Sequence, residues 1–378
     1  MMSNSRRLKI ISVSDAIYPY NKGGKEKRIF EISTRLAAAG HDVHLYTMKW
    51  WKGKKKTRIE NGVHLHAISP LYPLYAGERR SIKEALLFSL HCFKLIFANF
   101  DILDVDHMPH MVLFPTKLVA MLKGKKLYAT WNEVWSREYW VEYLGVLGNA
   151  AYLIELLSSR MPDKIIAVSE MTKKKLVNDL GVTKEVIVIP NGIDVASIKK
   201  AKVSKEKSDV IFAGRLLKHK NVDVLVNAVT LLKKDFPRIK AFIVGEGPEK
   251  NNIKQKAKNL KLERNVFFFD FLEKHEDLYA LMKSSKVFVF PSTREGFGIT
   301  ALEANACGLP VVTTNHKDNA AKYLITDGKN GYLTTLTAKN IKDKVATLLK
   351  KKITTSSEIG KHYNWQTLSK NVEEAYLK

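Results

Sequence analysis

The chain has 378 residues, enough for two or three domains, and its 45% hydrophobic and 27% charged residues exclude a disordered or fibrous protein. Its 63 Lys and Arg outnumber 38 Asp and Glu, and the formal net charge of +25 attracts polyanions such as nucleic acid or an anionic membrane face. The two cysteines, Cys92 and Cys307, lie far apart without metal-ligand spacing, which argues against a disulfide framework and favours a reducing compartment.

The first apolar run, LKIISVS, is expected to be a β-strand, because it is too short for a signal peptide. No uncharged apolar run of about 18 residues occurs, so no membrane-spanning helix is predicted. Basic clusters occur at Lys52–Arg58, Lys123–Lys126, Lys173–Lys175 and Lys199–Lys207. Each could be a solvated face, but the overall excess favours contact with an anionic membrane. The expected location is the cytoplasm, with the inner face of the cell membrane as the contact site, and no nucleic-acid partner is expected.

Strand-like and helix-like patterns alternate along the whole chain, which predicts parallel sheets covered by helices on both faces. In the first half, strands are expected at residues 8–14, 41–48, 101–107, 126–131 and 164–169, with a helix at 25–40. Ser169 is expected to cap a helix that Gly181 ends.

A turn cluster, Pro190–Asp194, and a lysine-rich stretch predict a domain boundary, after which the alternation restarts. The expected fold is α/β, with two Rossmann-like doubly wound domains facing each other across a ligand-binding cleft. The predicted domains are an acceptor domain at 1–190, a nucleotide-sugar donor domain at 191–355, and a C-terminal helix at 356–378 that crosses back to the first domain.

The most informative motif is EGFGITALE, at Glu295–Glu303. It follows an apolar strand, contains a glycine-spaced turn and opens a helix, an arrangement that binds anions through free N–H groups and the helix dipole. Its two acids suit hydroxyl groups, and a nucleotide-sugar carries both a diphosphate and hydroxyls. The alternative is a capping box, with Thr300 as the N-cap and Glu303 three positions later.

Weaker signals accompany this motif. Gly23 and Gly24 precede the first helix, where adjacent glycines allow backbone to approach a phosphate, although by themselves they favour a simple tight turn. Arg215 and Lys220 follow the first strand of the second half and could converge on a diphosphate. Gly247, in the turn GEGP, ends the next strand on the side where a base would bind.

Taken in order, these segments resemble the family-4 retaining glycosyltransferases of the glycosyltransferase-B fold, also described as glycosyl transferases group 1. The resemblance covers nearly the whole chain. It is carried by the paired glycines at 23–24 and by PNGID, AGRLLKHKN, VGEGP, EGFGITALEANACGLPVV and DGKNG.

The resemblance implies specific roles. Arg215 and Lys220 would neutralise the donor diphosphate, Glu295 would hold sugar hydroxyls, and Glu303 would bind the ribose. The remaining donor contacts would come from Gly23, Gly24, Gly247, Phe271, Leu272, Gly296, Phe297, Gly298 and Ile299. The family works without a bound metal ion or other cofactor, and the UDP- or GDP-linked sugar is a substrate.

The chain departs from the family pattern at two places. In TWNEVWS, Asn132 stands where a site histidine near the reacting sugar is expected, and Asn cannot take a proton near neutral pH. In Asn315–Ala321, the sequence NHKDNAA replaces a glycine-rich element, so the donor sugar is assigned less specifically.

Acceptor contacts are predicted weakly, from His107, Trp131, Glu133 and Trp135. The tryptophans could equally belong to the core, and His107 could be a structural histidine. A basic, apolar helix at 85–97 could lie on a membrane or pack on the first sheet.

The predicted function is retaining, metal-independent transfer of a hexose from a nucleoside-diphosphate sugar to a hydroxyl acceptor, such as a lipid-linked saccharide or a cell-envelope glycan. Two alternatives remain. One is a catalytically weakened protein of the same fold that binds polyanions or membranes, and the other is a sugar-nucleotide epimerase.

Overall fold

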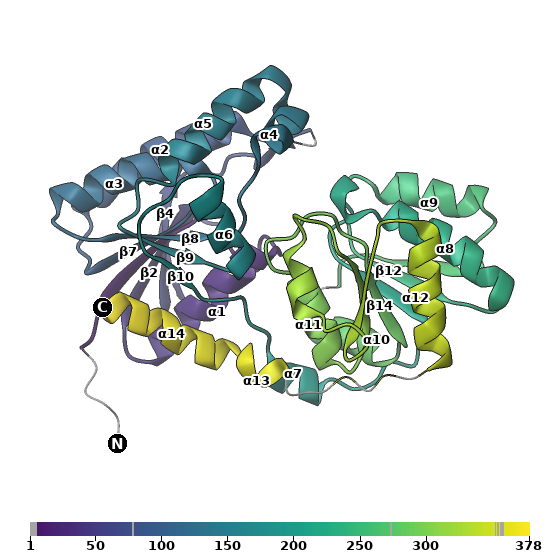
Figure 1. Cartoon of the computed structure of the whole chain (residues 1–378). Helices are drawn as coiled ribbons and strands as arrows, with labels where there is room; N and C mark the ends of the chain where they lie inside the picture. Colours follow the sequence, from purple (N-terminus) through teal and green to yellow (C-terminus); the bar gives the residue numbers. More distant parts are fainter. Residues whose placement is uncertain (1–5, 78, 273, 352, 354, 356–358) are drawn as a thin grey trace. The chain divides into compact units, whose positions relative to one another are not determined.

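A computed structural model describes residues 6–77, 79–272, 274–351, 353, 355 and 359–378 (Figure 1). The chain divides into two compact units, Met1–Asn191 with Trp365–Lys378 (unit 1) and Gly192–Asn364 (unit 2). Unit 1 therefore takes in the C-terminal helix, whereas residues 359–364, which sequence analysis grouped with that helix, belong to unit 2.

Unit 1 is built on an eight-stranded sheet with the strand order β10-β9-β8-β7-β1-β2-β4-β3. Its longer strands are β1 (Lys9–Val13), β2 (Asp42–Met48), β3 (Thr57–Glu60), β4 (Val63–Ser69), β7 (Ile102–Asp106), β8 (Leu127–Trp131), β9 (Lys164–Ala167) and β10 (Val186–Val188). A separate short hairpin pairs β5 (Tyr75–Ala76) with β6 (Arg79–Arg80). Within the eight-stranded sheet the strands pair in parallel except β3, whose antiparallel pairing with β4 was not predicted.

The helices of unit 1 cover both faces of its sheet. They are α1 (Gly24–Ala38), α2 (Ile82–His91), η1 (Cys92–Phe97), η2 (His110–Val112), α3 (Leu113–Leu122), α4 (Arg137–Leu144), η3 (Gly145–Leu147), α5 (Gly148–Ser158), α6 (Glu170–Asn178) and α14 (Trp365–Leu377). Successive residues of a strand point to opposite faces. Ile10 thus packs with α1 and α14, whereas Ile11 packs with α2, η1 and α3. As predicted, the Ser169 side chain caps α6 by accepting from the Thr172 N–H.

Unit 2 is a six-stranded parallel sheet with the order β13-β12-β11-β14-β15-β16. Its strands are β11 (Val210–Ala213), β12 (Ala241–Val244), β13 (Val266–Phe269), β14 (Val287–Phe290), β15 (Val311–Thr314) and β16 (Gly331–Thr334). Its helices are α7 (Val195–Lys200), η4 (Lys218–Lys220), α8 (Val222–Asp235), α9 (Lys250–Asn259), α10 (His275–Lys283), α11 (Ile299–Ala306), η5 (Ala320–Leu324), α12 (Ala338–Lys350) and α13 (Ile359–His362). This is the doubly wound order of a Rossmann-type sheet, so the predicted α/β fold class is confirmed.

The C-terminal helix is fastened to the sheet of unit 1 by buried polar contacts. The Tyr376 hydroxyl donates to Asp104 on β7, and the Tyr128 hydroxyl on β8 donates to the carbonyl of Ala375 at 3.0 Å. Burial raises the pKa of both Asp104 and Tyr376. Such contacts explain why a segment remote in sequence belongs to unit 1. Among the described residues, no helix is both long and apolar enough to cross a bilayer.

Replacing Tyr376 with Phe should lower the free energy of unfolding of unit 1 by about 1–3 kcal/mol, because a buried carboxylate loses a hydrogen-bond donor. Urea unfolding followed by tryptophan fluorescence measures this, since all 6 tryptophans lie in unit 1. Tyr323→Phe is the control, as Tyr323 is 62% exposed in unit 2. An unchanged unfolding curve for the Tyr376 variant would show that the Asp104 contact contributes nothing.

Candidate active site

The predicted donor loops of unit 2 leave one edge of its sheet. Because the strands are parallel, the loops that follow β11, β12, β14 and β15 all start at the same edge. The neighbours β11 and β14 lie where the strand order reverses, which is where doubly wound sheets bind ligands. Arg215 and Lys220 follow β11, and Glu295 follows β14, so the topology brings the predicted phosphate and sugar residues together.

Lys220 and Glu295 form an ion pair between Nζ and Oε1, and both side chains are mostly buried. Lys220 Nζ also lies 4.9 Å from the centroid of the Phe290 ring. Sequence analysis assigned these residues to different parts of a donor, the diphosphate and the sugar. Since each neutralises the other here, a diphosphate would compete with Glu295 for the lysine.

Main-chain contacts hold the loop after β11 against the loop after β14. The carbonyl of His219 accepts from the Thr293 N–H at 2.9 Å, and Asn221 Nδ2 donates to the carbonyl of Pro291 at 3.1 Å. Asn221 takes a left-handed conformation with φ of 50°, which asparagine tolerates better than most residues. These contacts fix the direction in which Lys220 leaves the backbone.

His219 lies within a cluster of cations. Its pKa is lowered to about 2, chiefly by burial and then by Arg294, Lys220 and Arg215. The imidazole is therefore neutral, and the positive charge around it belongs to the two arginines and the lysine. Such a cluster suits a diphosphate, whose negative charge grows as a sugar–phosphate bond breaks.

Gly245 and Gly247 allow the loops after β11 and β12 to touch. A Cβ atom on Gly245 would lie 2.0 Å from the carbonyl oxygen of Gly214, and one on Gly247 would lie 2.3 Å from that of Leu216. The Leu216 N–H donates to the carbonyl of Glu246 at 2.8 Å. Close loop packing thus accounts for Gly247, whose contact with a donor stays a prediction.

Glu303 is not part of a capping box. Helix α11 begins at Ile299 with Gly298 as its N-cap, and no side chain caps it. The Glu303 carboxylate is buried and accepts from the Tyr279 hydroxyl at 2.9 Å. Burial, and then Glu303 itself, raise the pKa of Tyr279, so that hydroxyl remains a donor. The capping alternative was wrong, because a left-handed glycine starts the helix.

The glycine turn before α11 is tightly packed. Gly298 has φ of 99°, and a Cβ atom there would lie 2.5 Å from that of Ala321. Phe297 is buried with its ring centroid 5.7 Å from that of Tyr363, whereas Gly296 and Ile299 are half-buried. The first N–H groups of a helix lack partners within it, so the amides that follow Gly298 remain suited to an anion.

The remaining donor residues lie on the loop after β13. Phe271 is exposed and Leu272 half-buried, so both are accessible, but neither is brought to Glu295 by a contact that the structure describes. Their contact with a base stays a prediction.

The unusual segment Asn315–Ala321 supports Glu295. The Glu295 N–H donates to the carbonyl of Asp318 at 3.0 Å, and the Ala320 N–H donates to the carbonyl of Glu295 at 2.9 Å. The fully buried Asn319 anchors the segment by donating to the carbonyl of Thr314 at 2.9 Å. This departure from the family pattern therefore builds the loop that positions the main chain of Glu295.

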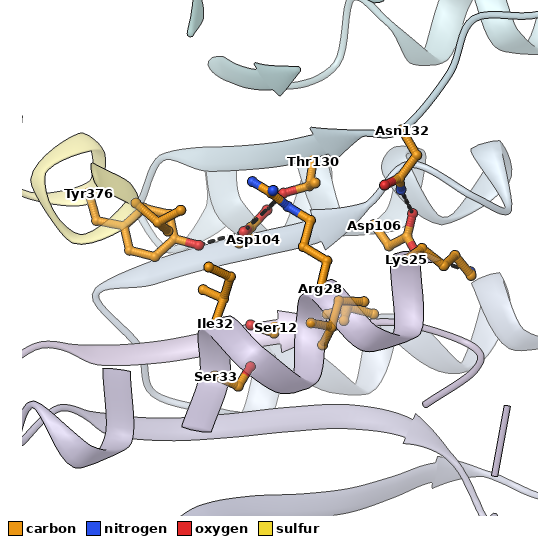
Figure 2. Close-up of a pocket in the computed structure, with 13 residues that line it drawn as sticks. Ser12, Lys25, Arg28, Ile32, Ser33, Asp104, Asp106, Thr130, Asn132 and Tyr376 are labelled. Carbon is orange, nitrogen blue, oxygen red and sulfur yellow. Dashed lines mark hydrogen bonds and ion pairs between the residues drawn. The ribbon is translucent and has the colours of Figure 1, made fainter. Parts of the chain in front are cut away.

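In unit 1, a cavity of about 30 Å³ lies at the carboxyl ends of β1, β7 and β8. That volume has room for about two water molecules. Its polar lining is shown in Figure 2 and consists of Ser12, Lys25, Arg28, Ser33, Asp104, Asp106, Thr130, Asn132 and Tyr376. Arg28, a buried cation, donates to the carbonyl of Pro190 at 2.7 Å. This hydrogen bond holds the last residues of the Met1–Asn191 segment beside the cavity.

The paired glycines lead directly into this charged lining. Gly23 caps α1, and a Cβ atom on it would lie 2.3 Å from Oε2 of Glu26. Lys25 Nζ lies 2.7 Å from Asp15 and 3.0 Å from Asp106, so it bridges two buried carboxylates. Gly24 is the first residue of α1. Gly23 thus leaves room for the folded-back Glu26 side chain, and donor binding by both glycines stays a prediction.

Asn132 faces the same cavity. Its Nδ2 donates to Asp106 Oδ1 at 3.3 Å (Figure 2). Its N–H donates to His107 Nδ1 at 3.4 Å. The pKa of Asp106 is lowered by Lys25 and by His107 in spite of its burial, so this carboxylate is ionised. The amide therefore interacts with a charged neighbour, but it supplies no titratable group of its own.

Three of the weak acceptor candidates, Trp131, Trp135 and His107, are buried in the core of unit 1. Trp131 is fully buried on β8, and the His107 ring stacks on it with centroids 4.7 Å apart. Trp135 is also buried and packs against Trp140, with centroids 4.4 Å apart. The core interpretation thus accounts for both tryptophans and for His107, because their rings are covered. Glu133 is half-buried, and its acceptor contact stays a prediction.

Two protein families match the sequence in tandem. Glycosyltransferase Family 4 matches residues 22–197, and Glycosyl transferases group 1 matches residues 194–364, where the cation cluster and both glutamates lie. Together the two matches span residues 22–364, and the chain belongs to the glycosyltransferases that these two families describe. One component of the human phosphatidylinositol N-acetylglucosaminyltransferase is 26% identical to this glycosyltransferase over 318 residues, which cover 82% of the chain and 62% of the relative. The chain thus spans less than two thirds of that relative's length.

Solved structures share the fold of this glycosyltransferase. Sucrose-phosphate synthase from Thermosynechococcus elongatus matches with a TM-score of 0.79 and 18% identity, over 98% of both chains. Anabaena HepE in complex with UDP-glucose matches with a TM-score of 0.74 and 17% identity, over 98% of this chain and 99% of HepE. These likenesses confirm the predicted glycosyltransferase-B fold.

Three residues around the candidate sites were not predicted from the sequence: Arg294 and Asn319 in unit 2, and Lys25 in unit 1. Arg294 immediately precedes Glu295, and this adjacency was a usable signal. Asn319 and Lys25 gave weaker signals, because an asparagine in a loop and a lysine beside glycines are common. Their importance depends on contacts with residues distant in sequence, namely Thr314, Asp15 and Asp106.

Replacing Glu84 with Gln should flatten the pH dependence of unit 1 stability. Burial, and then Asp15, raise the pKa of Glu84 from 4.5 to about 8. Between these values the folded protein keeps a proton that the unfolded chain releases, so stability falls as the pH rises, by about 2–4 kcal/mol.

Urea unfolding at a series of pH values, followed by tryptophan fluorescence, measures this slope in both proteins. The control is Glu142→Gln, which changes an exposed acid of α4 and should leave the slope unaltered. Parallel pH profiles for the wild-type protein and the Glu84 variant would contradict the assignment.

Proposed function

We propose that this protein is a retaining, metal-independent glycosyltransferase that moves a hexose from a UDP-linked sugar to a hydroxyl of a lipid-linked saccharide. The observation that carries the proposal is the pairing of Lys220 with Glu295 beside Arg215 and Arg294, at the switch point of unit 2. Family membership supports the reaction class, and the UDP-glucose complex of HepE supports a uridine donor. A GDP-linked donor is the alternative.

The proposed chemistry follows from this arrangement. Arg215 and Lys220 would stabilise charge on the departing diphosphate, together with the N–H groups at the start of α11. Once the phosphate attracts Lys220, the Glu295 carboxylate would be free to accept hydrogen bonds from sugar hydroxyls. Because these groups already supply positive charge, we propose that no metal ion is required. Retention would proceed by attack on the same face of the sugar, without a protein nucleophile.

The proposed acceptor is supported by the name of a relative rather than by contacts within this chain. The human relative's name specifies phosphatidylinositol and N-acetylglucosamine, which favours a lipid-borne hydroxyl and extends the donor panel to N-acetylhexosamines. A cell-envelope glycan is the other acceptor class to test. The proposed location is the cytoplasm, at the inner face of the cell membrane, consistent with the free cysteines Cys92 and Cys307.

Lys220→Ala should weaken binding of UDP and of UDP-sugars alike by roughly 10–100-fold, because a charge-assisted phosphate contact is lost. Glu295→Ala should instead leave UDP binding intact or tighter, since Lys220 loses its competitor, while the preference for a particular UDP-sugar disappears. Calorimetry with UDP and a panel of UDP- and GDP-linked hexoses and N-acetylhexosamines measures both effects.

Lys218→Ala is the matched control, because Lys218 is exposed on the same loop. Unchanged UDP affinity in the Lys220 variant would disprove the phosphate assignment. Sugar-nucleotide binding without transfer to any glycolipid would favour the catalytically weakened alternative that Asn132 suggests. Conversion of the donor to an isomeric sugar-nucleotide would favour the epimerase.

A further inference from the structure

Four helical segments of unit 1 present apolar side chains to solvent. On α2 and η1 these are Ile82, Leu86, Leu90, Phe93 and Phe97, and on α3 and α5 they are Leu118, Met121, Leu122, Leu153 and Leu157. We refer to these residues as the apolar helical face. Phe97 is 90% exposed and Leu122 is 68% exposed, whereas a soluble protein normally turns such side chains inward.

Two of these helices bury acidic or polar side chains and expose apolar ones. A surface helix of a soluble protein buries its apolar stripe and exposes polar residues. In α5 the buried residues are Gly148, Glu155 and Ser158, whereas Leu153 and Leu157 are exposed. In α2 the buried residues are Glu84, Phe88 and Ser89, and the exposed residues include Leu86 and Leu90.

The apolar residues follow one stripe and the helices adjoin one another. Ile82, Leu86 and Leu90 are four residues apart, and Phe93 and Phe97 follow on η1 after steps of three and four residues. Helix α3 contacts both α2 and η1, and η2 contacts both α2 and α5. Figure 1 shows α2, α3 and α5 on the side of unit 1 away from α14.

The charges on these segments have one sign. Their exposed charged residues are Lys83 and Lys94, while their acids, Glu84 and Glu155, are buried. Arg79, Lys123, Lys125, Lys126 and Arg160 flank the segments. Two copies of the chain would bring like charges together in a molecule of net charge +25, whereas an anionic headgroup layer would attract them.

We propose that the apolar helical face docks on an anionic lipid bilayer, with α2, η1, α3 and α5 lying in the interface and the basic residues contacting the headgroups. This decides the open alternative for the helix at 85–97: one side packs on the sheet through Phe88, Cys92 and Leu95, and the other side contacts lipid. The surface works whether or not sugar is transferred.

The experiment is flotation with vesicles of phosphatidylcholine alone or of phosphatidylcholine mixed with phosphatidylglycerol. The full chain should bind the mixed vesicles at least about tenfold better, and added salt should reduce that binding. The triple variant Leu86→Ser, Leu90→Ser, Phe97→Ser should lose at least about tenfold in partitioning. The double variant Lys83→Gln, Lys94→Gln should lose about 25-fold, at about fivefold per charge.

Matched controls alter exposed residues elsewhere. Ile59→Ser with Val203→Ser changes two apolar residues that are 65% and 62% exposed, and Lys200→Gln with Lys202→Gln removes two exposed charges. Both control proteins should bind vesicles as the wild type does. UDP binding by every variant, measured without lipid, keeps this test separate from that of the proposed function.

Equal vesicle binding by the wild type and the serine triple variant would overturn the proposal. So would a concentration-dependent dimer that only the triple variant abolishes, because the face would then bind a second copy of the chain. Binding to phosphatidylcholine alone as strong as binding to the mixed vesicles would also overturn the proposal, because the basic residues would then not contribute to docking.

Discussion

Parallel pairing of β11 with β14 places Lys220 beside Glu295, and the rest of the candidate donor site depends on this adjacency. Both strands are buried on both faces, so their apolar side chains determine their position. The loops that follow must then leave from the same edge and converge. An ion pair between residues 75 positions apart is therefore a consequence of strand order rather than of local sequence.

The charged side chains of the two units are used differently. In unit 2, cations outnumber acids around His219, and the resulting positive potential suits an anionic ligand. In unit 1, Lys25 lies between Asp15 and Asp106, and Arg80 pairs with Asp15, so the charges largely cancel. Removing one partner of such a buried set leaves an uncompensated charge, which is why these contacts constrain the structure more than they add stability.

The apolar helical face and the polar interior beneath it are two aspects of one arrangement. The carboxylate of Glu155 accepts from the Trp135 N–H at 3.0 Å and from Trp140 Nε1 at 2.6 Å, and burial raises its pKa to about 8. Helices whose polar side chains are satisfied inside the protein can expose leucine and phenylalanine to lipid. An amphipathic helix can therefore bury its polar side and expose its apolar side where a bilayer replaces water as its outer neighbour.

The sequence by itself determined the alternation of strands and helices, the fold class and the position of the EGFGITALE loop, because hydrophobic periodicity and glycine spacing are local properties. Only the tertiary structure decided which side chains meet. It assigned Glu303 to Tyr279 instead of a helix cap, buried Trp131, joined β3 to β4 and added Arg294 to the cation cluster. These outcomes depend on burial and on contacts between distant segments, which set the energy of a polar group and which a linear pattern does not encode.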